Sequence, residues 1–187
     1  MTMFARDLSV AHYRSFDSYR LALDDGVTVL AGPNAAGKTN LIEALQLLTS
    51  GASFRHPTAT ELVHDGVGSC RVQLRLEGDG RVLDMGLSVE DGKRSFSRNG
   101  KKCSAAGVRG VLPSVLFCPD HLDMVKRGAS VRRAALDDFG VQLSARYADL
   151  ASAYGRCVTQ RNALLKESWC CREMLGAWNE SIARAGS

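Results

Sequence analysis

Much of the first 118 residues alternates apolar and polar positions, the period of a β-strand with one buried face. Residues 4–10 and 19–23 follow this alternation, and Asp24-Asp25-Gly26 after them predicts a turn. The same alternation predicts further strands at residues 71–76, 82–89, 94–98 and 101–103. Asn99-Gly100 separates the last two strands, and that pair is typical of a two-residue hairpin turn. We therefore expect an antiparallel β subdomain.

A different pattern begins after this first turn. Residues 27–31 are short, apolar and partly β-branched, which predicts a buried strand. A glycine-bearing loop follows from Gly32 to Gly37, and residues 39–50 then predict a helix that ends at Gly51. The apolar face of this helix is predicted to contain Leu41, Ile42, Leu45 and Leu48.

Beyond residue 119 the apolar spacing changes to the three- and four-residue steps of a helix. Pro119 is in a suitable position to begin a short helix that extends to Val125. A helical pattern starts near residue 130, with one apolar stripe over residues 143–165, and a further helix begins at about Cys171. We therefore expect two domains, residues 1–118 and residues 119–187, of which the second is helical.

The glycine-bearing loop fits the pattern G-x-x-x-x-G-K-[ST] in full. The backbone amides of such a loop and the helix after it converge on a bound phosphate. Lys38 would reach the β- and γ-phosphates of a nucleotide, and the Thr39 hydroxyl would hold Mg²⁺. An incidental lysine after a glycine-containing turn is the alternative interpretation. The predicted site for ATP and Mg²⁺ consists of Gly32, Pro33, Asn34, Ala35, Ala36, Gly37, Lys38 and Thr39.

Composition narrows the class of protein only a little. The chain has 187 residues, of which 45% are hydrophobic and 24% charged, as in an ordinary soluble domain. No stretch approaches the ~20 apolar residues of a membrane span, and residues 1–14 lack a signal-peptide core. We therefore expect a cytoplasmic protein without a membrane partner. Six cysteines without a C-x-x-C pair predict free thiols and no zinc site.

Basic residues gather in one short stretch, although the net charge of the whole chain is only +4. This stretch, residues 93–102, contains no acid and five basic residues, which are Lys93, Arg94, Arg98, Lys101 and Lys102. Alternate residues of a strand share a face, so Arg94 and Arg98 are expected to align. The stretch fits contacts with a DNA backbone. A solvated surface is the alternative interpretation.

Several of these segments resemble one known family. Similarity to the opening of RecF is carried by residues 12–16, 24–26, 27–30 and 32–44. More specific matches follow in the same order at residues 53–55, 99–101, 112–122, 132–133 with 136–137, 160–166 and 177–179. The resemblance covers nearly the whole chain and identifies it as a member of the RecF family, in the SMC/Rad50-like branch of the ABC-type ATPases.

The resemblance implies an α/β fold, the first lobe of an ABC/Rad50-like P-loop NTPase head. The phosphate loop and the β subdomain would lie in residues 1–118, and a helical subdomain, cut short at its end, in residues 119–187. Arg14 resembles the basic residue near the adenosine end of the nucleotide, and Asn34 resembles the loop residue that approaches the γ-phosphate. A surface arginine and a turn former are the alternatives. Asp120 lies near the link between the lobes, but the Gln that many relatives use there is absent, so no catalytic role is carried over.

The family also implies a function and partners. It implies an ATP-binding, DNA-binding protein of recombinational DNA repair and replication, active after DNA damage and in the SOS response. ATP would join two heads on single-stranded or gapped duplex DNA, and hydrolysis would release them. Other recombination mediator proteins are implied as partners.

Two elements of an ABC-type ATP site do not occur in the sequence, namely a Walker B strand and a Ser- and Gly-rich signature loop. In the family both lie near the carboxyl end, so the chain resembles the amino-terminal half. We expect no hydrolysis by this chain alone, and its status as an enzyme is open. Without parallel neighbours from the second half, the strand at residues 27–31 would be exposed.

Three alternatives to this interpretation stay open. The nearest is a head fragment of another SMC- or OLD-like ATPase. A non-catalytic module that binds nucleotide or DNA without turnover is the second. The third is a small P-loop phosphotransferase. Two strands precede the loop, and no acceptor-binding arginine set is evident, which disfavours this class.

Overall fold

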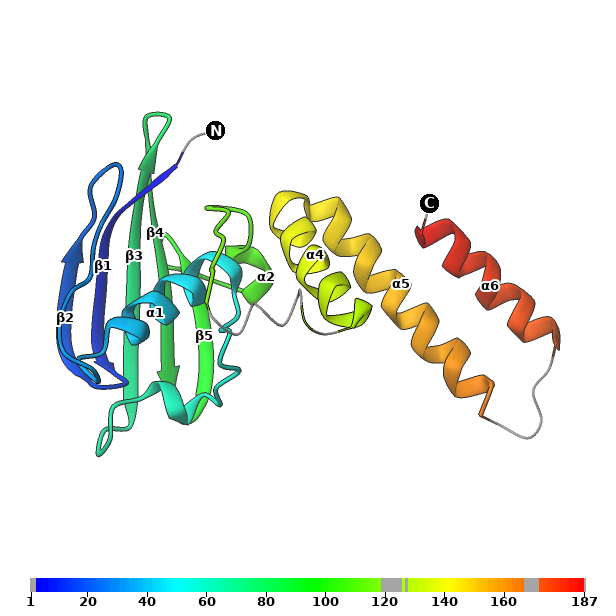
Figure 1. The fold of residues 1–187 in the computed structure, drawn as a ribbon, viewed down its shortest axis with the longest axis horizontal. Helices are drawn as coiled ribbons and strands as arrows, with labels where there is room; N and C mark the ends of the chain where they lie inside the picture. The colour runs from blue at the N-terminus through cyan, green and yellow to red at the C-terminus, as the bar shows by residue number, and fades with distance from the viewer. Residues whose placement is uncertain (1–2, 119–125, 127, 167–171, 187) are drawn as a thin grey trace. The chain divides into compact units, whose positions relative to one another are not determined.

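The structure is a computed structural model that describes residues 3–118, 126, 128–166 and 172–186. The chain divides into two compact units, Met1–Leu116 and Phe117–Ser187 (Figure 1). Three sequence predictions lie outside the described residues: the short helix at 119–125, the position of Asp120 and the helix start at Cys171.

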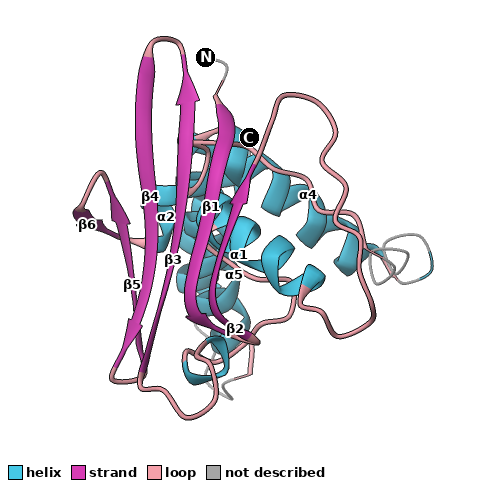
Figure 2. Cartoon of the chain, turned by 90° about the vertical axis from the view of Figure 1, so that its left-hand side faces the viewer, coloured by secondary structure: helices cyan, strands magenta, loops and turns pink. Residues whose placement is uncertain are grey.

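The first unit is built on a six-stranded sheet in which every neighbouring pair of strands is antiparallel (Figure 2). The order across the sheet is β2-β1-β3-β4-β5-β6. The strands are β1 (Phe4–Tyr13), β2 (Phe16–Ala22), β3 (Ser69–Gly78), β4 (Arg81–Glu90), β5 (Lys93–Arg98) and β6 (Lys101–Cys103). The six predicted alternating strands and their antiparallel sheet are confirmed. Most observed strands are longer than predicted, because backbone pairing continues into polar residues beyond the apolar alternation.

Three tight turns connect the hairpins of β3 to β6. Asp79-Gly80, Asp91-Gly92 and Asn99-Gly100 all have positive φ at both residues, for example 49° at Asn99 and 74° at Gly100. A type I′ turn requires positive φ at both central positions, which Asn, Asp and Gly tolerate best. The hairpin predicted at Asn99-Gly100 is therefore confirmed. The Asn99 side chain adds to it, because its Oδ1 accepts a hydrogen bond of 2.8 Å from the Asp84 backbone.

One face of the sheet carries the helices α1 (Lys38–Ser50) and α2 (Ala105–Val108) (Figures 1 and 2). Helix α1 packs against β3 and β4, and α2 packs against β5. The short 3-10 helix η1 (Thr60–Leu62) lies in the connection between α1 and β3. The core between these layers is apolar, and its largest buried side chains include Leu8, Leu47, Leu48, Leu62, Leu74, Leu76, Met85 and Leu87.

The helix predicted at residues 39–50 is confirmed as α1, but its predicted apolar face is partly wrong. Leu41 and Leu48 are buried, whereas Ile42 is 37% exposed. The buried face runs from Leu41 through Ala44 to Leu48 in steps of three and four, and Ile42 is about 100° away from Leu41 around the helix. Glu43 was not predicted to lie on the buried face of α1, but its side chain is fully buried.

The prediction of a buried strand at residues 27–31 is wrong. This segment forms no strand, and Val27 and Val29 are 92% and 78% exposed. A strand requires a neighbour that accepts and donates backbone hydrogen bonds. Within the described part of the chain, the sheet ends at β2 and β6, and no strand pairs with residues 27–31. The exposure expected for a segment without neighbours is therefore observed.

The second unit is helical, as predicted. Its described helices are α4 (Ala129–Leu143), α5 (Ala145–Leu164) and α6 (Arg172–Gly186). The apolar stripe over residues 143–165 is not one helix, because Ser144 separates α4 from α5. Its Oγ accepts a hydrogen bond of 3.2 Å from the Tyr147 backbone and caps α5, the usual role of serine at a helix start.

Helix α5 packs against both of its neighbours in this unit. Tyr147 Oη donates a hydrogen bond of 2.5 Å to Asp137 of α4, and Arg161 Nε donates one of 2.8 Å to Asn179 of α6. Gly140 of α4 makes the first of these contacts possible, since a Cβ there would lie 2.6 Å from the Tyr147 ring. No helix in the described ranges has both the length and the apolar character needed to cross a bilayer.

Candidate nucleotide-binding site

The predicted phosphate loop leads directly into α1, as the sequence indicates. Gly37 is the N-cap residue of α1, with φ of 90°, and its carbonyl accepts hydrogen bonds from the amides of Asn40 and Leu41 at 2.9 and 3.2 Å. The amides of Lys38 and Thr39 lie in the first turn of α1, where a helix offers its amides no carbonyl acceptor, so they are available to an anion. Ala35 has φ of 66°, a left-handed conformation that glycine adopts more easily.

Lys38 folds back over this loop. Its Nζ donates hydrogen bonds to the carbonyls of Gly32 and Pro33, at 2.8 and 2.7 Å. The ammonium group is thereby held beside the loop and the first amides of α1, where a cation and a helix N-terminus favour the same negatively charged ligand. Thr39 is exposed in the first turn of α1, and Asn34 is exposed in the loop. These residues fit the phosphates of a nucleotide, with the Thr39 hydroxyl available to Mg²⁺.

The turn between β1 and β2 lies against the phosphate loop. Asn40 Nδ2 donates a hydrogen bond of 3.0 Å to Ser15 Oγ. A Cβ at Gly37 would lie 2.4 Å from the Phe16 ring and 2.9 Å from Ser15 Oγ. Only glycine therefore fits at position 37 with this turn in place. The motif indicates the need for glycine at this position, but it does not indicate which segment touches it.

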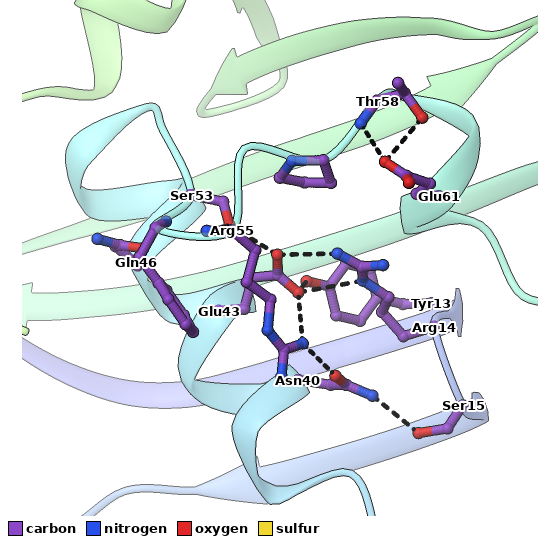
Figure 3. Close-up of polar contacts among 12 residues, drawn as sticks. Tyr13, Arg14, Ser15, Asn40, Glu43, Gln46, Ser53, Arg55, Thr58 and Glu61 are labelled. Carbon is purple, nitrogen blue, oxygen red and sulfur yellow. Dashed lines mark hydrogen bonds and ion pairs between the residues drawn. The ribbon is translucent and has the colours of Figure 1, made fainter. Parts of the chain in front are cut away.

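Next to this turn is a buried carboxylate, that of Glu43 on α1 (Figure 3). It accepts hydrogen bonds from Arg14 Nε and Nη2 at 3.1 and 2.9 Å, from Ser53 Oγ at 2.6 Å and from Tyr13 Oη at 3.2 Å. Arg55 Nη1 is 3.4 Å from the same carboxylate. We call these five residues the Glu43 cluster.

The Glu43 cluster is not predicted by the sequence patterns. One signal is available, because Glu43 lies four residues before Leu47 and therefore on the same side of α1 as the core. An acid at such a position needs buried partners. The sequence does not show where those partners are, since Tyr13 is 30 residues away along the chain.

The charges of the Glu43 cluster shift the pKa values of its members. Burial by itself raises the pKa of Glu43, but hydrogen bonds from Arg14 and Ser53 and the charges of Arg14 and Arg55 outweigh burial and lower it below the usual 4.5. Burial, followed by the negative charge of Glu43, strongly raises the pKa of the Tyr13 hydroxyl. Glu43 is therefore ionised and Tyr13 is neutral at neutral pH.

Arg14, predicted to lie near the adenosine end of a nucleotide, is fixed at both backbone and side chain. Its φ is 54°, an unusual value for arginine. Its amide donates a 3.0 Å hydrogen bond to the Leu62 carbonyl, and its own carbonyl accepts one of 2.6 Å from His64 Nδ1. Its Nε and Nη2 are directed at Glu43, and the side chain is 20% exposed. A contact of Arg14 with a nucleotide stays a prediction.

The predicted DNA-binding residues lie on β5 and β6, but they are divided between two faces of the sheet. Phe96 of β5 is buried, and Arg94 and Arg98 lie two residues before and after it on the same face. They therefore align as predicted, on the core side of the sheet. Lys101 pairs with Arg98 and shares that side, whereas Lys93 and Lys102 lie on the opposite face. Arg94 is half-buried and donates a hydrogen bond to the Pro57 carbonyl. The other four basic side chains are exposed.

The antiparallel sheet, the phosphate loop and α1 define a P-loop ATPase fold of the ABC type, as predicted. The family model described as AAA domain matches residues 7–109, which include the loop, α1 and nearly all of the sheet. The chain therefore belongs to the AAA-domain family.

Relatives within this fold are RecF proteins. The chain is 33% identical over 196 residues to the "DNA replication and repair protein RecF" of Streptomyces avermitilis, an alignment that covers 99% of this chain and 52% of the relative. It is 34% identical over 193 residues to the protein of the same name from Paenarthrobacter aurescens, with 99% and 48% covered. The chain thus spans about half the length of these relatives, and its predicted resemblance to RecF is confirmed.

Solved structures agree with this assignment. The chain superimposes on the recombination mediator protein RecF-ATPrS in the RecFOR pathway with a TM-score of 0.86 and 28% identity, covering 98% of this chain and 51% of that one. The corresponding RecF-ATP structure gives a TM-score of 0.84 at the same identity and coverage. The fold of the described residues is therefore shared with nucleotide-bound relatives over about half of their length.

Proposed function

We propose that this chain binds ATP with Mg²⁺ at residues 32–39 and acts in DNA repair and replication as part of a RecF-type ATPase head. The observation that carries the proposal is the position of Lys38 Nζ, held over the loop beside the open amides of α1. Similarity to structures named RecF-ATPrS and RecF-ATP supports ATP as the nucleotide.

The site residues have separate roles in this proposal. The backbone N–H groups of the loop, which Pro33 lacks, surround the phosphates. Lys38 binds the β- and γ-phosphates, and the Thr39 hydroxyl holds Mg²⁺. Asn34 approaches the γ-phosphate and Arg14 the adenosine end. Held by the Thr39 hydroxyl, Mg²⁺ would neutralise part of the phosphate charge.

DNA is the proposed macromolecular partner, as a single strand or a gapped duplex in the cytoplasm. Its backbone would contact the exposed basic residues of β5 and β6. Residues 1–118 would form the ATPase lobe and residues 119–187 the helical subdomain of a head that pairs with a second head when ATP is bound. We propose that the protein works with other recombination mediators after DNA damage, as part of the SOS response. Hydrolysis is not proposed for this chain alone, because its sequence has no Walker B strand or signature loop.

Lys38→Ala is expected to weaken binding of a fluorescent ATP analogue in the presence of Mg²⁺ by at least about a hundredfold, since charge-assisted contacts to phosphate are strong. The measurement is an equilibrium titration of the chain and of the variant, with folding checked by circular dichroism. Lys93→Ala is the matched control, because it removes the same charge from β5 and leaves the loop intact. A folded chain that does not bind the analogue, or a Lys38→Ala variant that binds it equally well, would rule out the proposed site.

Replacing Lys101 and Lys102 together by alanine is expected to weaken binding of single-stranded DNA. It should also reduce the slope of log affinity against log salt by about 0.7 for each phosphate of the single strand that the variant no longer neutralises. The measurement is fluorescence anisotropy at several salt concentrations. Arg20→Ala is the control, since this exposed arginine lies on β2 at the other edge of the sheet. Equal slopes for the double variant and the unmodified chain would mean that β6 does not contact DNA.

A further inference from the structure

Three separate stretches of the chain meet at the Glu43 carboxylate. The end of β1 supplies Tyr13 and Arg14, the loop after α1 supplies Ser53 and Arg55, and α1 supplies the acid itself (Figure 3). These four donors all come from outside α1, so the carboxylate ties the phosphate-loop helix to both of its neighbouring segments.

These contacts continue to the phosphate loop. Arg55 Nη1 also donates a hydrogen bond of 2.9 Å to Asn40 Oδ1, and Asn40 Nδ2 donates one to Ser15 Oγ at 3.0 Å. Asn40 is two residues after Lys38, and Ser15 lies against Gly37. The Glu43 cluster is therefore connected, through the Asn40 side chain, to the proposed phosphate loop.

The two arginines of the cluster are held in different ways. Arg14 is fixed by backbone contacts with Leu62 and His64 in addition to its ion pair. Arg55 has a more exposed side chain, at 38%, and its guanidinium contacts only Glu43, Asn40 and the Phe54 ring among the described residues. Of the two guanidinium groups, that of Arg55 also contacts Asn40, the side chain that leads to the phosphate loop.

The identity of residue 43 also needs a physical explanation. Burying a carboxylate is costly, and an apolar side chain of similar size in its place would often give equal or greater stability. Its neighbours Ala44 and Leu47 on the buried side of α1 are apolar. Stability alone therefore does not account for an acid at this position, whereas fixing two cations beside an anion site does.

We propose that Glu43 is a positioning residue of the nucleotide site, which holds Arg14 and Arg55 in place beside the phosphate loop. Arg55 is the member that adds positive charge next to an anionic ligand. The proposal rests on the proposed function, because it concerns the same nucleotide site.

The test is the affinity of Glu43→Gln for the fluorescent ATP analogue. Glutamine has the same shape, but its amide nitrogen accepts no hydrogen bond and the side chain carries no charge to attract the arginines. We expect the folded variant to bind about tenfold more weakly than the unmodified chain. Binding is measured well below the melting temperature, so that both proteins are folded throughout.

Two controls separate positioning from a loss of stability or charge. Glu90→Gln makes the same chemical change at the exposed end of β4. Val89→Ala removes a buried side chain of β4 and lowers the melting temperature without touching the cluster. Both are expected to bind the analogue within about twofold of the unmodified chain.

A double-mutant cycle with Arg55→Met tests whether Glu43 acts through this arginine. In the proposal, Arg55→Met alone weakens binding, and Glu43→Gln with Arg55→Met binds no more weakly than Glu43→Gln alone. If the loss of binding free energy in the double variant equals the sum of the losses in the two single variants, Glu43 does not act through Arg55, and the proposal is overturned. If Glu43→Gln does not fold, Arg55→Met still tests the proposal. Unchanged affinity of Arg55→Met for the analogue would overturn it.

Failure of this inference differs from failure of the proposed function. If the unmodified chain binds the analogue and Lys38→Ala abolishes binding, the nucleotide site is established. Glu43→Gln that then binds as tightly as Val89→Ala would show that Glu43 has only a structural role. Absence of binding by the folded, unmodified chain would contradict both the site and the inference that rests on it.

Discussion

Replacing Arg14 by methionine is expected to lower the free energy of unfolding of the first unit by about 3 kcal/mol at neutral pH. Arg14 supplies two of the hydrogen bonds to Glu43, which is 0% exposed. Without them, the carboxylate stays buried with Ser53, Tyr13 and the longer contact to Arg55. Removing one partner of a buried ion pair is costly because the remaining charge is no longer compensated.

The sign of the pH dependence distinguishes this explanation from a general loss of packing. In the unmodified chain the pKa of Glu43 is lowered, so its contribution to stability is present above about pH 4.5 and is lost as the pH falls through the lowered value. In Arg14→Met, burial is opposed by fewer partners, so we expect the pKa of Glu43 to lie above its value in the unmodified chain. Acidification then protonates the buried acid of the variant first, so the difference in stability between the two proteins shrinks as the pH falls from the variant's pKa for Glu43 to the lower pKa of the unmodified chain.

Hydrogen exchange in β3 is the suitable measurement. Both tryptophans of the sequence, Trp169 and Trp178, belong to the second unit, so their fluorescence does not report on the sheet. Arg6→Met is the control, because it removes partly exposed ion pairs, one of 2.8 Å with Asp25 and a longer one of 3.6 Å with Glu77 at the end of β3. Such a pair contributes at most about 1 kcal/mol. An Arg14→Met variant that loses no more protection than this control, or whose loss does not change with pH, would contradict the explanation.

The sequence predicted those parts of the fold that depend on neighbouring residues. Alternation of apolar and polar positions identified the strands of the antiparallel sheet, and Asn99-Gly100 identified its last turn, since both signals are local. The phosphate loop was equally clear, because its glycines, Lys38 and the following helix are contiguous. The prediction for residues 27–31 was wrong because it, too, used only local signals. Their sequence favours a strand, but a strand also needs a partner, and the described sheet provides none.

The Glu43 cluster shows what local signals leave out of a site. Its members come from β1, from α1 and from the loop after α1, and Tyr13 and Glu43 are 30 positions apart. Each residue alone has an ordinary interpretation, such as Arg14 on the surface. The contacts of Tyr13 and Arg14 with residues 62–64, together with the packing of α1 on the sheet, bring them together. The cluster is therefore a consequence of the tertiary fold, which local sequence patterns do not reveal.

The end of α1 gives the second large prediction, because Gly51 has both a special conformation and a close neighbour. Its φ is 73°, and its amide donates a hydrogen bond of 3.1 Å to the Leu47 carbonyl. A Cβ at this position would lie 2.5 Å from the backbone oxygen of Ala105, at the start of α2. This neighbour is backbone, so relief of the clash requires α1 or α2 to move.

We expect Gly51→Ala to destabilise the first unit by about 3 kcal/mol or more, from the left-handed conformation and the backbone clash together. Gly80→Ala is the matched control. Its φ is 69°, but a Cβ there would meet nothing within 4 Å, so it should lose only about 1 kcal/mol. The stabilities of the Gly51→Ala and Gly80→Ala variants are compared by measuring hydrogen exchange in β3 at increasing temperature. The difference between the variants measures how tightly α1 is held at its C-terminal end. Equal losses would mean that α2 moves away from Gly51 at little cost, and that the phosphate-loop helix is fixed chiefly at its other end, by the Glu43 cluster.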